Sequence, residues 1–303
     1  MVKQLFILFV AVFFVKNNSF AQSNGILPLS GIRYFKEGIW AKSIDVKIDG
    51  AWLLGNRLPL NKEIEISLQQ PSGFIADINK TVFAAAEFIL ESAKGELILK
   101  NPNVFLLNET KGFAAKDFKT LSIKFGINEE LMKYNSNCLI RIRVYDLKGK
   151  NQLRLEFPVN IIRYGEAVQL SKSVNLVKSP SGSTCLIAGL TAKNMLVSVD
   201  TTIKVSPNMA YTSLDIFKIL GTSLGGIFQG KENFWVYDNG LNEIKISDIL
   251  LKQVGGALED NDIDYTLKIP YRLKKVAGKS YTVRFRWQSA DKSQVIDVVA
   301  SAQ

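Results

Sequence analysis

The sequence predicts an all-β protein made of two related β-sandwich domains, and three features lead to that prediction. Short segments in which apolar and polar residues alternate recur along the chain, with turn residues between them and no βα alternation. One segment occurs almost twice, as NCLIRIRVYDLKGKNQ at 137–152 and SYTVRFRWQSADKSQ at 280–294. A polar stretch that ends in SPSGS at 179–183 lies between the two halves and is typical of a linker.

The first 21 residues carry the features of a secretory signal peptide. Lys3 supplies a positive charge, residues 5–15 (LFILFVAVFFV) are uninterrupted apolar, and Ser19 and Ala21 are small residues at the −3 and −1 positions of a cleavage site. The apolar run is shorter than the about 20 residues that a membrane helix needs. We therefore expect cleavage after Ala21, and an exported, soluble protein that is periplasmic or extracellular. No cysteine stands at the cleavage site, so we expect no lipid anchor. No later segment is long and apolar enough to span a bilayer, so we expect no stable membrane insertion.

Composition narrows the classes of partner. The chain has 303 residues, of which 47% are hydrophobic and 22% charged, as expected for two globular domains. Its formal charge of +10 falls to +8 (10 − 2) when Lys3 and Lys16 leave with the signal peptide. The lysines are scattered and the protein is exported, so we do not expect a nucleic-acid partner. The excess charge is either an ordinary lysine-rich surface or a preference for an anionic glycan or envelope surface.

The repeated segment predicts the same β-hairpin in each half. In residues 140–144 (IRIRV) and 283–287 (VRFRW), apolar and charged residues alternate strictly. Successive side chains of a strand point to opposite faces, so we expect the apolar residues in a core and all four arginines in water. A polar turn and a further strand follow each segment, at 153–159 and 295–299.

Two further segments repeat at nearly the same spacing. Residues 120–125 (TLSIKF) match 264–269 (DYTLKI) at an offset of 144, and a strand-turn-strand pattern from Glu87 matches one from Asn233 at an offset of 146. Repeats of this length indicate a duplicated domain and not a solenoid, whose periods are shorter.

The remaining strand patterns complete the domain prediction. Residues 43–48 (SIDVKI) and 63–68 (EIEISL) alternate as well. Many short strands separated by turn signals are typical of immunoglobulin-like sandwiches. The predicted organisation is a signal peptide at 1–21, a first immunoglobulin-like β-sandwich domain at 22–163 and a second at 166–303.

The sequence lacks the residues that the common hydrolases use. It contains no histidine, which excludes Ser-His-Asp and Cys-His hydrolases and imidazole zinc sites. Residues 225–231 fit the spacing of a phosphate-binding loop, but Glu232 stands where Ser or Thr must hold magnesium, and we interpret the match as coincidence. No cofactor is expected. Cys138 and Cys185 are expected to be two buried thiols, because a disulfide would have to join the halves.

One acidic stretch contains the candidate metal ligands of the sequence. Asp260, Asp262 and Asp264 alternate, which is a spacing that can hold calcium through carboxylate oxygens. Tyr265 stands where an EF-hand loop needs Gly. We therefore expect a solvated loop that leads into a strand, and no metal site.

Two tryptophans are the candidate binding residues. Trp40 and Trp52 flank a strand pattern, and on the surface they would stack on a sugar ring or on a protein partner. Packing at the edge of the core is the alternative for both. Trp287 continues an apolar face and is expected in the core.

The sequence therefore favours an exported, non-enzymatic binding or interaction protein of the cell envelope or extracellular space, with a protein or an anionic glycan as its partner. Two alternatives remain open. One is a carboxylate-dependent glycan hydrolase, which needs no histidine. The other is a structural spacer or assembly component of the envelope. The fold class alone does not choose among them.

Overall fold

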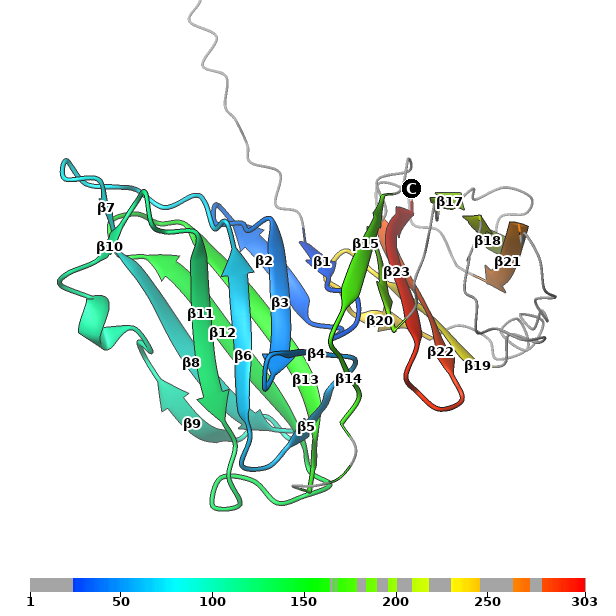
Figure 1. Cartoon of the computed structure of the whole chain (residues 1–303), viewed down its shortest axis with the longest axis horizontal. Coiled ribbons are helices and arrows are strands. Elements are labelled where there is room, and N and C mark those ends of the chain that lie inside the picture. The colour runs from blue at the N-terminus through cyan, green and yellow to red at the C-terminus, as the bar shows by residue number, and fades with distance from the viewer. Residues whose placement is uncertain are drawn as a thin grey trace, which may run out of the picture.

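The structure is all-β (Figure 1). This computed structural model describes residues 24–163, 166, 168–178, 184–189, 196–200, 209–217, 230–245, 264–272 and 280–302. Within these ranges the chain forms strands, with one 3-10 turn at Leu106–Asn108 and no α-helix. No helix in the described part is long and apolar enough to cross a bilayer. The predicted signal peptide lies outside the described residues.

Two sheets make up the first half, and they lie face to face in Figure 1. The larger sheet has the order β1 (Asn24–Ile26), β2 (Arg33–Glu37), β13 (Gln152–Ile162), β12 (Asn137–Asp146), β8 (Ala84–Ser92), β9 (Leu97–Asn101), with β5 (Arg57–Pro59) pairing with β13. The smaller has the order β11 (Thr120–Gly126), β6 (Glu63–Gln69), β3 (Ser43–Ile48), β4 (Ala51–Leu53), β14 (Leu170–Ser171). A short pair, β7 (Thr81–Val82) and β10 (Phe113–Ala114), lies at one end.

The strands that are described in the second half form two sheets. The larger has the order β15 (Val174–Lys178), β16 (Thr184–Ala188), β23 (Val295–Ala302), β22 (Tyr281–Ser289), β19 (Gly230–Tyr237), β20 (Glu243–Ile244). The smaller has the order β17 (Leu196–Asp200), β18 (Met209–Phe217), β21 (Asp264–Arg272).

The large sheets of the two halves share strand order and register. Reading from β9 to β1 and from β20 to β15, each sheet visits its six strands in the same relative chain order. In the hairpins, Ile142 lies opposite Leu155, and Phe285 lies opposite Val298. Each residue of the second hairpin is therefore numbered 143 higher than the matching residue of the first, in both strands. On the other side, Phe88 of β8 is opposite Ile142 and Phe234 of β19 is opposite Phe285, an offset of 146. The sequence match from Glu87 and Asn233 therefore has the same offset, 146, as the residues that hold matching positions in the paired strands.

The apolar residues of the repeated strand lie where the alternation predicts. Ile140, Ile142 and Val144 are buried in the core of the first half, among aliphatic side chains of both its sheets. Phe285 and Trp287 are buried in the second half. Alternation therefore correctly identified the inward face of β12 and of β22.

Both cysteines are buried and free, as predicted. Burial raises the pKa of the Cys138 thiol to about 11. Burial, assisted by the negative charge of Asp297, also raises the pKa of the Cys185 thiol. A thiolate is the reactive form of cysteine, so neither thiol is activated.

Thiol reactivity should show this directly. In the unreduced native protein, Ellman's reagent should label Cys138 and Cys185 only slowly, and both should react at once in denaturant. A disulfide would instead leave no reactive thiol in denaturant before reduction. Rapid labelling of the native protein would show that the two strands do not bury these side chains.

Candidate functional site

The outer face of the large sheet in the second half contacts the first half. Arg284, Arg286 and Gln288 point to this face, because they alternate with the buried Phe285 and Trp287. A small apolar cluster forms at the contact: Leu29 and Leu54 of the first half pack with Ala188 and Val295 of the second. The face that the repeated strand turns away from its own core is therefore covered.

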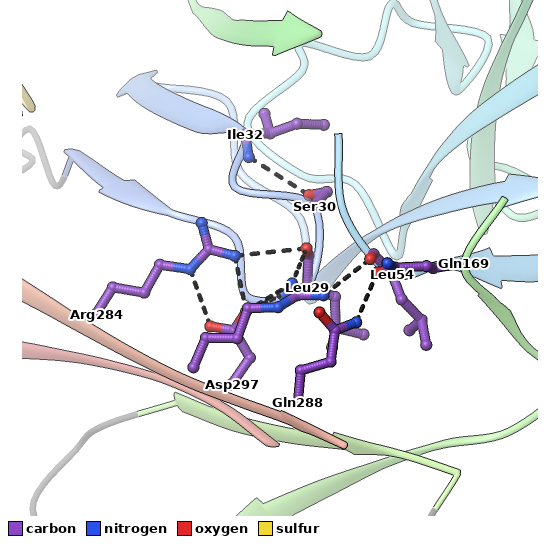
Figure 2. Close-up of polar contacts among 9 residues, drawn as sticks. Leu29, Ser30, Ile32, Leu54, Gln169, Arg284, Gln288 and Asp297 are labelled. Atoms are coloured by element: carbon purple, nitrogen blue, oxygen red, sulfur yellow. Dashed lines mark hydrogen bonds and ion pairs between the residues drawn. The ribbon is translucent and has the colours of Figure 1, made fainter. Parts of the chain in front are cut away.

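At the centre of the contact, two arginines share one carboxylate. We call Arg284, Arg286 and Asp297 the Arg–Asp cluster (Figure 2). Arg284 binds Asp297 in a bidentate way, with Nε 3.0 Å from Oδ1 and Nη2 2.7 Å from Oδ2. Arg286 Nη1 lies 3.3 Å from Oδ2. The two arginines are 8% and 7% exposed and Asp297 is fully buried, so a charge-assisted network replaces their hydration.

The Arg–Asp cluster holds a turn of the first half. The Leu29 N–H donates to Asp297 Oδ2 at 3.1 Å, and the Leu29 carbonyl accepts from Arg286 Nη1 at 2.8 Å and from Arg284 Nη2 at 3.4 Å. Arg286 Nη2 also donates to the carbonyl of Leu54 at 2.8 Å. These bonds satisfy backbone groups that are buried at the contact. The second half therefore recognises the backbone of the first.

The turn has the shape that this recognition needs. Leu29 has a φ of +66°, in the left-handed region that residues other than glycine rarely adopt. Gly31 follows with a φ of +77°, and a Cβ atom there would lie 2.5 Å from Arg284 Nη1. Gly31 is therefore favoured by the conformation of the backbone, and it also leaves room for the close approach of the guanidinium group.

The prediction that four arginines face water is right for two of them and wrong for two. Arg141 and Arg143 are partly exposed and pair with glutamates of β8, Glu91 at 2.9 Å and Glu87 at 3.1 Å. Arg284 and Arg286, at the matching positions, are buried in the Arg–Asp cluster. Alternation shows which side chains leave their own core, but a contact with another part of the chain decides whether water or protein covers them.

The cluster leaves an excess of positive charge at the contact, with two guanidinium groups to one carboxylate. Burial disfavours the charge of Arg284, but the Asp297 charge and hydrogen bonds outweigh burial and raise the pKa of Arg284. Burial and the neighbouring charge of Arg284 outweigh Asp297 at Arg286 and lower its pKa. Arginine remains protonated in proteins, so both side chains carry charge at neutral pH.

A pocket of about 380 Å³, which we call the Arg pocket, opens beside the cluster. From the second half, Asn233, Trp235 and Tyr237 project into it from one face of β19. The Arg284 guanidinium lies 5.1 Å from the centre of the Trp235 ring. The first half contributes Arg57 at the rim, 3.1 Å from Glu166. The remaining lining residues are Leu29, Ser30, Gly31, Leu53, Leu54, Gly55, Asn56, Pro158, Gln169, Arg284, Arg286 and Gln288.

Tyr237 should make the protein less stable as the pH rises in the alkaline range. Burial raises its pKa from 10.0 to about 12. Because the folded pKa lies above the unfolded pKa, this contribution is present below about pH 10 and is lost as the pH rises through about 12. Tyr237→Phe should reduce the alkaline loss of stability, measured by denaturant melts between pH 9 and 12. The part due to Tyr34, whose pKa burial also raises, should remain. An unchanged slope in Tyr237→Phe would mean that its hydroxyl is not buried.

A second hollow of about 620 Å³, the edge groove, lies on the β15–β16 side of the same contact. Ala41 to Asp45 and Trp52 line it from the small sheet of the first half, and Leu176 and Leu186 from the second. The other lining residues are Ile26, Leu27, Pro28, Tyr34, Lys36, Leu153, Val174 and Thr184. The contact thus has a hollow lined by three arginines on one side and a largely apolar hollow on the other.

The structure separates the two predicted tryptophans. Trp40 is 50% exposed and lines neither hollow; its backbone N–H donates to the carbonyl of Ser72. Trp52 is half-buried, lies in the edge groove, and carries the Lys47 ammonium group 5.0 Å from its ring centre. The two tryptophans therefore do not form one binding surface at either hollow.

The expectation that Asp260, Asp262 and Asp264 form a solvated loop and no calcium site stays a prediction. Asp260 and Asp262 lie outside the described residues, and Asp264 begins β21 with its side chain undescribed. Among the residues that the structure describes, no three His, Cys, Asp or Glu side chains come together as a metal site.

The sequence contains one signal for the residues that were missed. In VIDVVA at 295–300, Asp297 is the only charged residue of an otherwise apolar strand. A buried acid needs a partner, and the neighbouring strand offers Arg284 and Arg286. The turn at Leu29 has no comparable signal in the sequence.

Comparisons with known proteins add little to this geometry. No protein-family model matches the chain, and no curated protein matches it. A crystal structure of the FN1–FN3 domains of chicken CNTN1 is similar at 10% identity and a TM-score of 0.23. That match covers 88% of this chain and 65% of the CNTN1 chain.

Proposed function

We propose that the chain is an exported, non-enzymatic binding protein of the cell envelope or extracellular space. It consists of two immunoglobulin-like β-sandwich domains, at 22–163 and 166–303, after a signal peptide at 1–21. Its binding sites are the two hollows beside the contact between these domains. The partner is a protein or an anionic glycan.

The duplication is supported by the shared order and register of the two large sheets. Hairpins β12–β13 and β22–β23 keep one offset across the turn, where Asp146 N–H bonds the Asn151 carbonyl and Ser289 N–H bonds the Gln294 carbonyl. The two hairpins agree in turn length and therefore in register, because turn geometry sets register, and the strand order of the two large sheets is a separate agreement.

The observation that carries the binding proposal is the Arg–Asp cluster. It ties the second domain to the backbone of Leu29 and Leu54 through buried, charge-assisted bonds. A contact held in this way keeps the walls of both hollows in place before a ligand arrives, which lowers the ordering cost of binding. A spacer has no need of preformed hollows.

The charges at the hollows favour binding over glycan hydrolysis. A glycosidase of the usual kind needs two carboxyl groups about 5–10 Å apart. Among the described residues, no carboxylate lines the Arg pocket, and only Asp45 lines the edge groove. The excess guanidinium charge of the Arg pocket instead favours an acidic group on the partner.

Binding should be tested with the mature chain, 22–303, against immobilised polyuronate oligosaccharides and a library of displayed peptides. Arg57→Ala alters the rim of the Arg pocket, and Arg141→Ala is its control, since both arginines are exposed and salt-bridged. Leu176→Glu alters the edge groove, and Leu107→Glu is its control at an exposed leucine that lines neither hollow.

We expect a ligand that the wild type binds to bind about tenfold more weakly, equivalent to about 1.4 kcal/mol, to either Arg57→Ala or Leu176→Glu. Its affinity for the matching control variant should equal that for the wild type. An affinity that is unchanged in both Arg57→Ala and Leu176→Glu would contradict the proposal. So would the release of new reducing ends from the polyuronate.

A further inference from the structure

The edge of a strand forms one wall of the edge groove. Five consecutive residues, Ala41 to Asp45, line it, and the last three, Ser43 to Asp45, are consecutive residues of β3. Successive side chains of a strand point to opposite faces of the sheet. Consecutive residues therefore line one hollow only when the edge of the strand, with its peptide groups, faces that hollow.

This edge of β3 is open over four residues. β6 pairs with β3 along its whole length, from Ser43 to Ile48, whereas β4 pairs only with Lys47 and Ile48. Within the described part of the chain, no strand pairs with the second edge of Ser43–Val46. An open edge presents peptide N–H and carbonyl groups that another strand can bond.

The groove offers apolar contacts next to this edge. Ile26, Leu27 and Ile44 of the first half line it together with Leu176 and Leu186 of the second. Leu176 is 67% exposed, although a large aliphatic side chain at a domain contact is normally covered. An added strand sends alternate side chains to one face, so it would place apolar side chains against these walls.

Asp45 supplies a polar contact that is incomplete. It is 6% exposed, and Gln69 Nε2 donates to its Oδ2 at 3.3 Å. Its Oδ1 atom is buried without a hydrogen-bond partner among the described residues. Buried carboxylate oxygens are normally paired, so Asp45 Oδ1 is an unsatisfied acceptor at the wall of the groove, with the Ser43 hydroxyl beside the carboxylate. Burial also raises the pKa of Asp45.

We propose that the edge groove binds an extended segment of a partner protein, which adds a strand along Ser43–Val46. The segment places an apolar side chain against Ile44 and Leu176 and presents a hydrogen-bond donor to Asp45 Oδ1. Lys36 and Lys42 line the groove and favour an acidic residue elsewhere in the segment. This inference rests on the proposed function. A peptide suits the site better than a glycan, because an open strand edge pairs with peptide groups and the walls are mainly aliphatic.

Random 12-residue peptides should be selected by display against the mature chain, and their affinities measured by calorimetry. We expect Leu176→Glu and Asp45→Asn to weaken binding about tenfold. Leu107→Glu and Asp49→Asn are the controls, and should bind as the wild type does; Asp49 is an exposed carboxylate that pairs with Lys62. Thermal melts should first show that each variant is folded.

Amide hydrogen exchange reports on the edge itself, independently of affinity. Some amides within Ser43–Val46 should exchange fast in the free protein, because only one edge of β3 is paired, and at least about tenfold more slowly with peptide bound. Amides that are all protected in the free protein would overturn the inference, because another part of the chain would already cover the edge.

Other outcomes separate this inference from the proposed function. If the retained ligands respond to Arg57→Ala and ignore Leu176→Glu, the edge-groove inference falls and the proposed function stands. The same holds if a polyuronate, and no peptide, protects Ser43–Val46. If no ligand of either kind responds to either hollow, both fail.

Discussion

Asp297→Ala should destabilise the protein by about 3–5 kcal/mol, the cost typical of removing one partner from a buried ion pair. The change leaves Arg284 and Arg286 buried without the carboxylate that they share. It also removes the acceptor of the Leu29 N–H. Denaturant melts at neutral pH, followed by circular dichroism, measure the effect.

Two arginines at matching positions provide the control for this prediction. Arg284→Gln should cost several kcal/mol, since it leaves Asp297 buried with less compensation. Arg141→Gln removes a partly exposed pair with Glu91 and should cost about 0–1 kcal/mol. Equal costs for the two changes would mean that the outer face of β22 is solvated like that of β12, and that the Arg–Asp cluster does not hold the contact.

The same variants should change how the protein unfolds. The cluster supplies the main polar bonds between the halves, and each half has buried apolar residues of its own. Once Asp297 is replaced, we expect two separate transitions in place of a coupled one. A single transition that is merely shifted would show that the apolar contact around Leu29 and Leu54 is sufficient to couple the halves.

The repeated segment shows what can be predicted from a sequence and what cannot. Alternation identified the inward residues of β12 and β22, because the period of two is a property of the strand itself. It did not distinguish Arg141 from Arg284, because that difference depends on a turn more than 250 residues away in the chain. Nothing in the sequence around Leu29 marks its carbonyl as the acceptor for two guanidinium groups.

The candidate site was predicted only in part, for a related reason. Aromatic residues beside a strand drew attention to Trp52, which does line a hollow, and to Trp40, which does not. Asp45 was passed over because an acid at an alternating position of SIDVKI looks like an ordinary solvated residue. Its burial comes from the arrangement around the edge groove, where residues of both halves meet, and a hollow of that kind has no local sequence signature.

Phe285→Ala should cost about 3–5 kcal/mol and Ile142→Ala about 2–5 kcal/mol, because each leaves a cavity in a packed core. The two side chains are 4% and 2% exposed and hold matching positions opposite Phe234 and Phe88. Phe285→Leu keeps most of the volume and should cost less than Phe285→Ala. A cost below about 1 kcal/mol for either alanine variant would place that side chain outside a core.

Tryptophan fluorescence can assign each loss to its half. Trp287 is buried in the second half, whereas Trp235 lines the Arg pocket at the contact, so a background in which Trp40, Trp52 and Trp235 are replaced by Phe reports on that half through Trp287. In this background Phe285→Ala should lower the unfolding midpoint of the second half by the whole of its predicted cost in stability. Ile142→Ala lies in the first half, so it should lower the midpoint of the second half only through the coupling that the Arg–Asp cluster provides. Adding Asp297→Ala should abolish this effect of Ile142→Ala on the midpoint. If Ile142→Ala still lowers the midpoint fully after the cluster is removed, the cluster is not what couples the halves, and the apolar contact around Leu29 and Leu54 is sufficient.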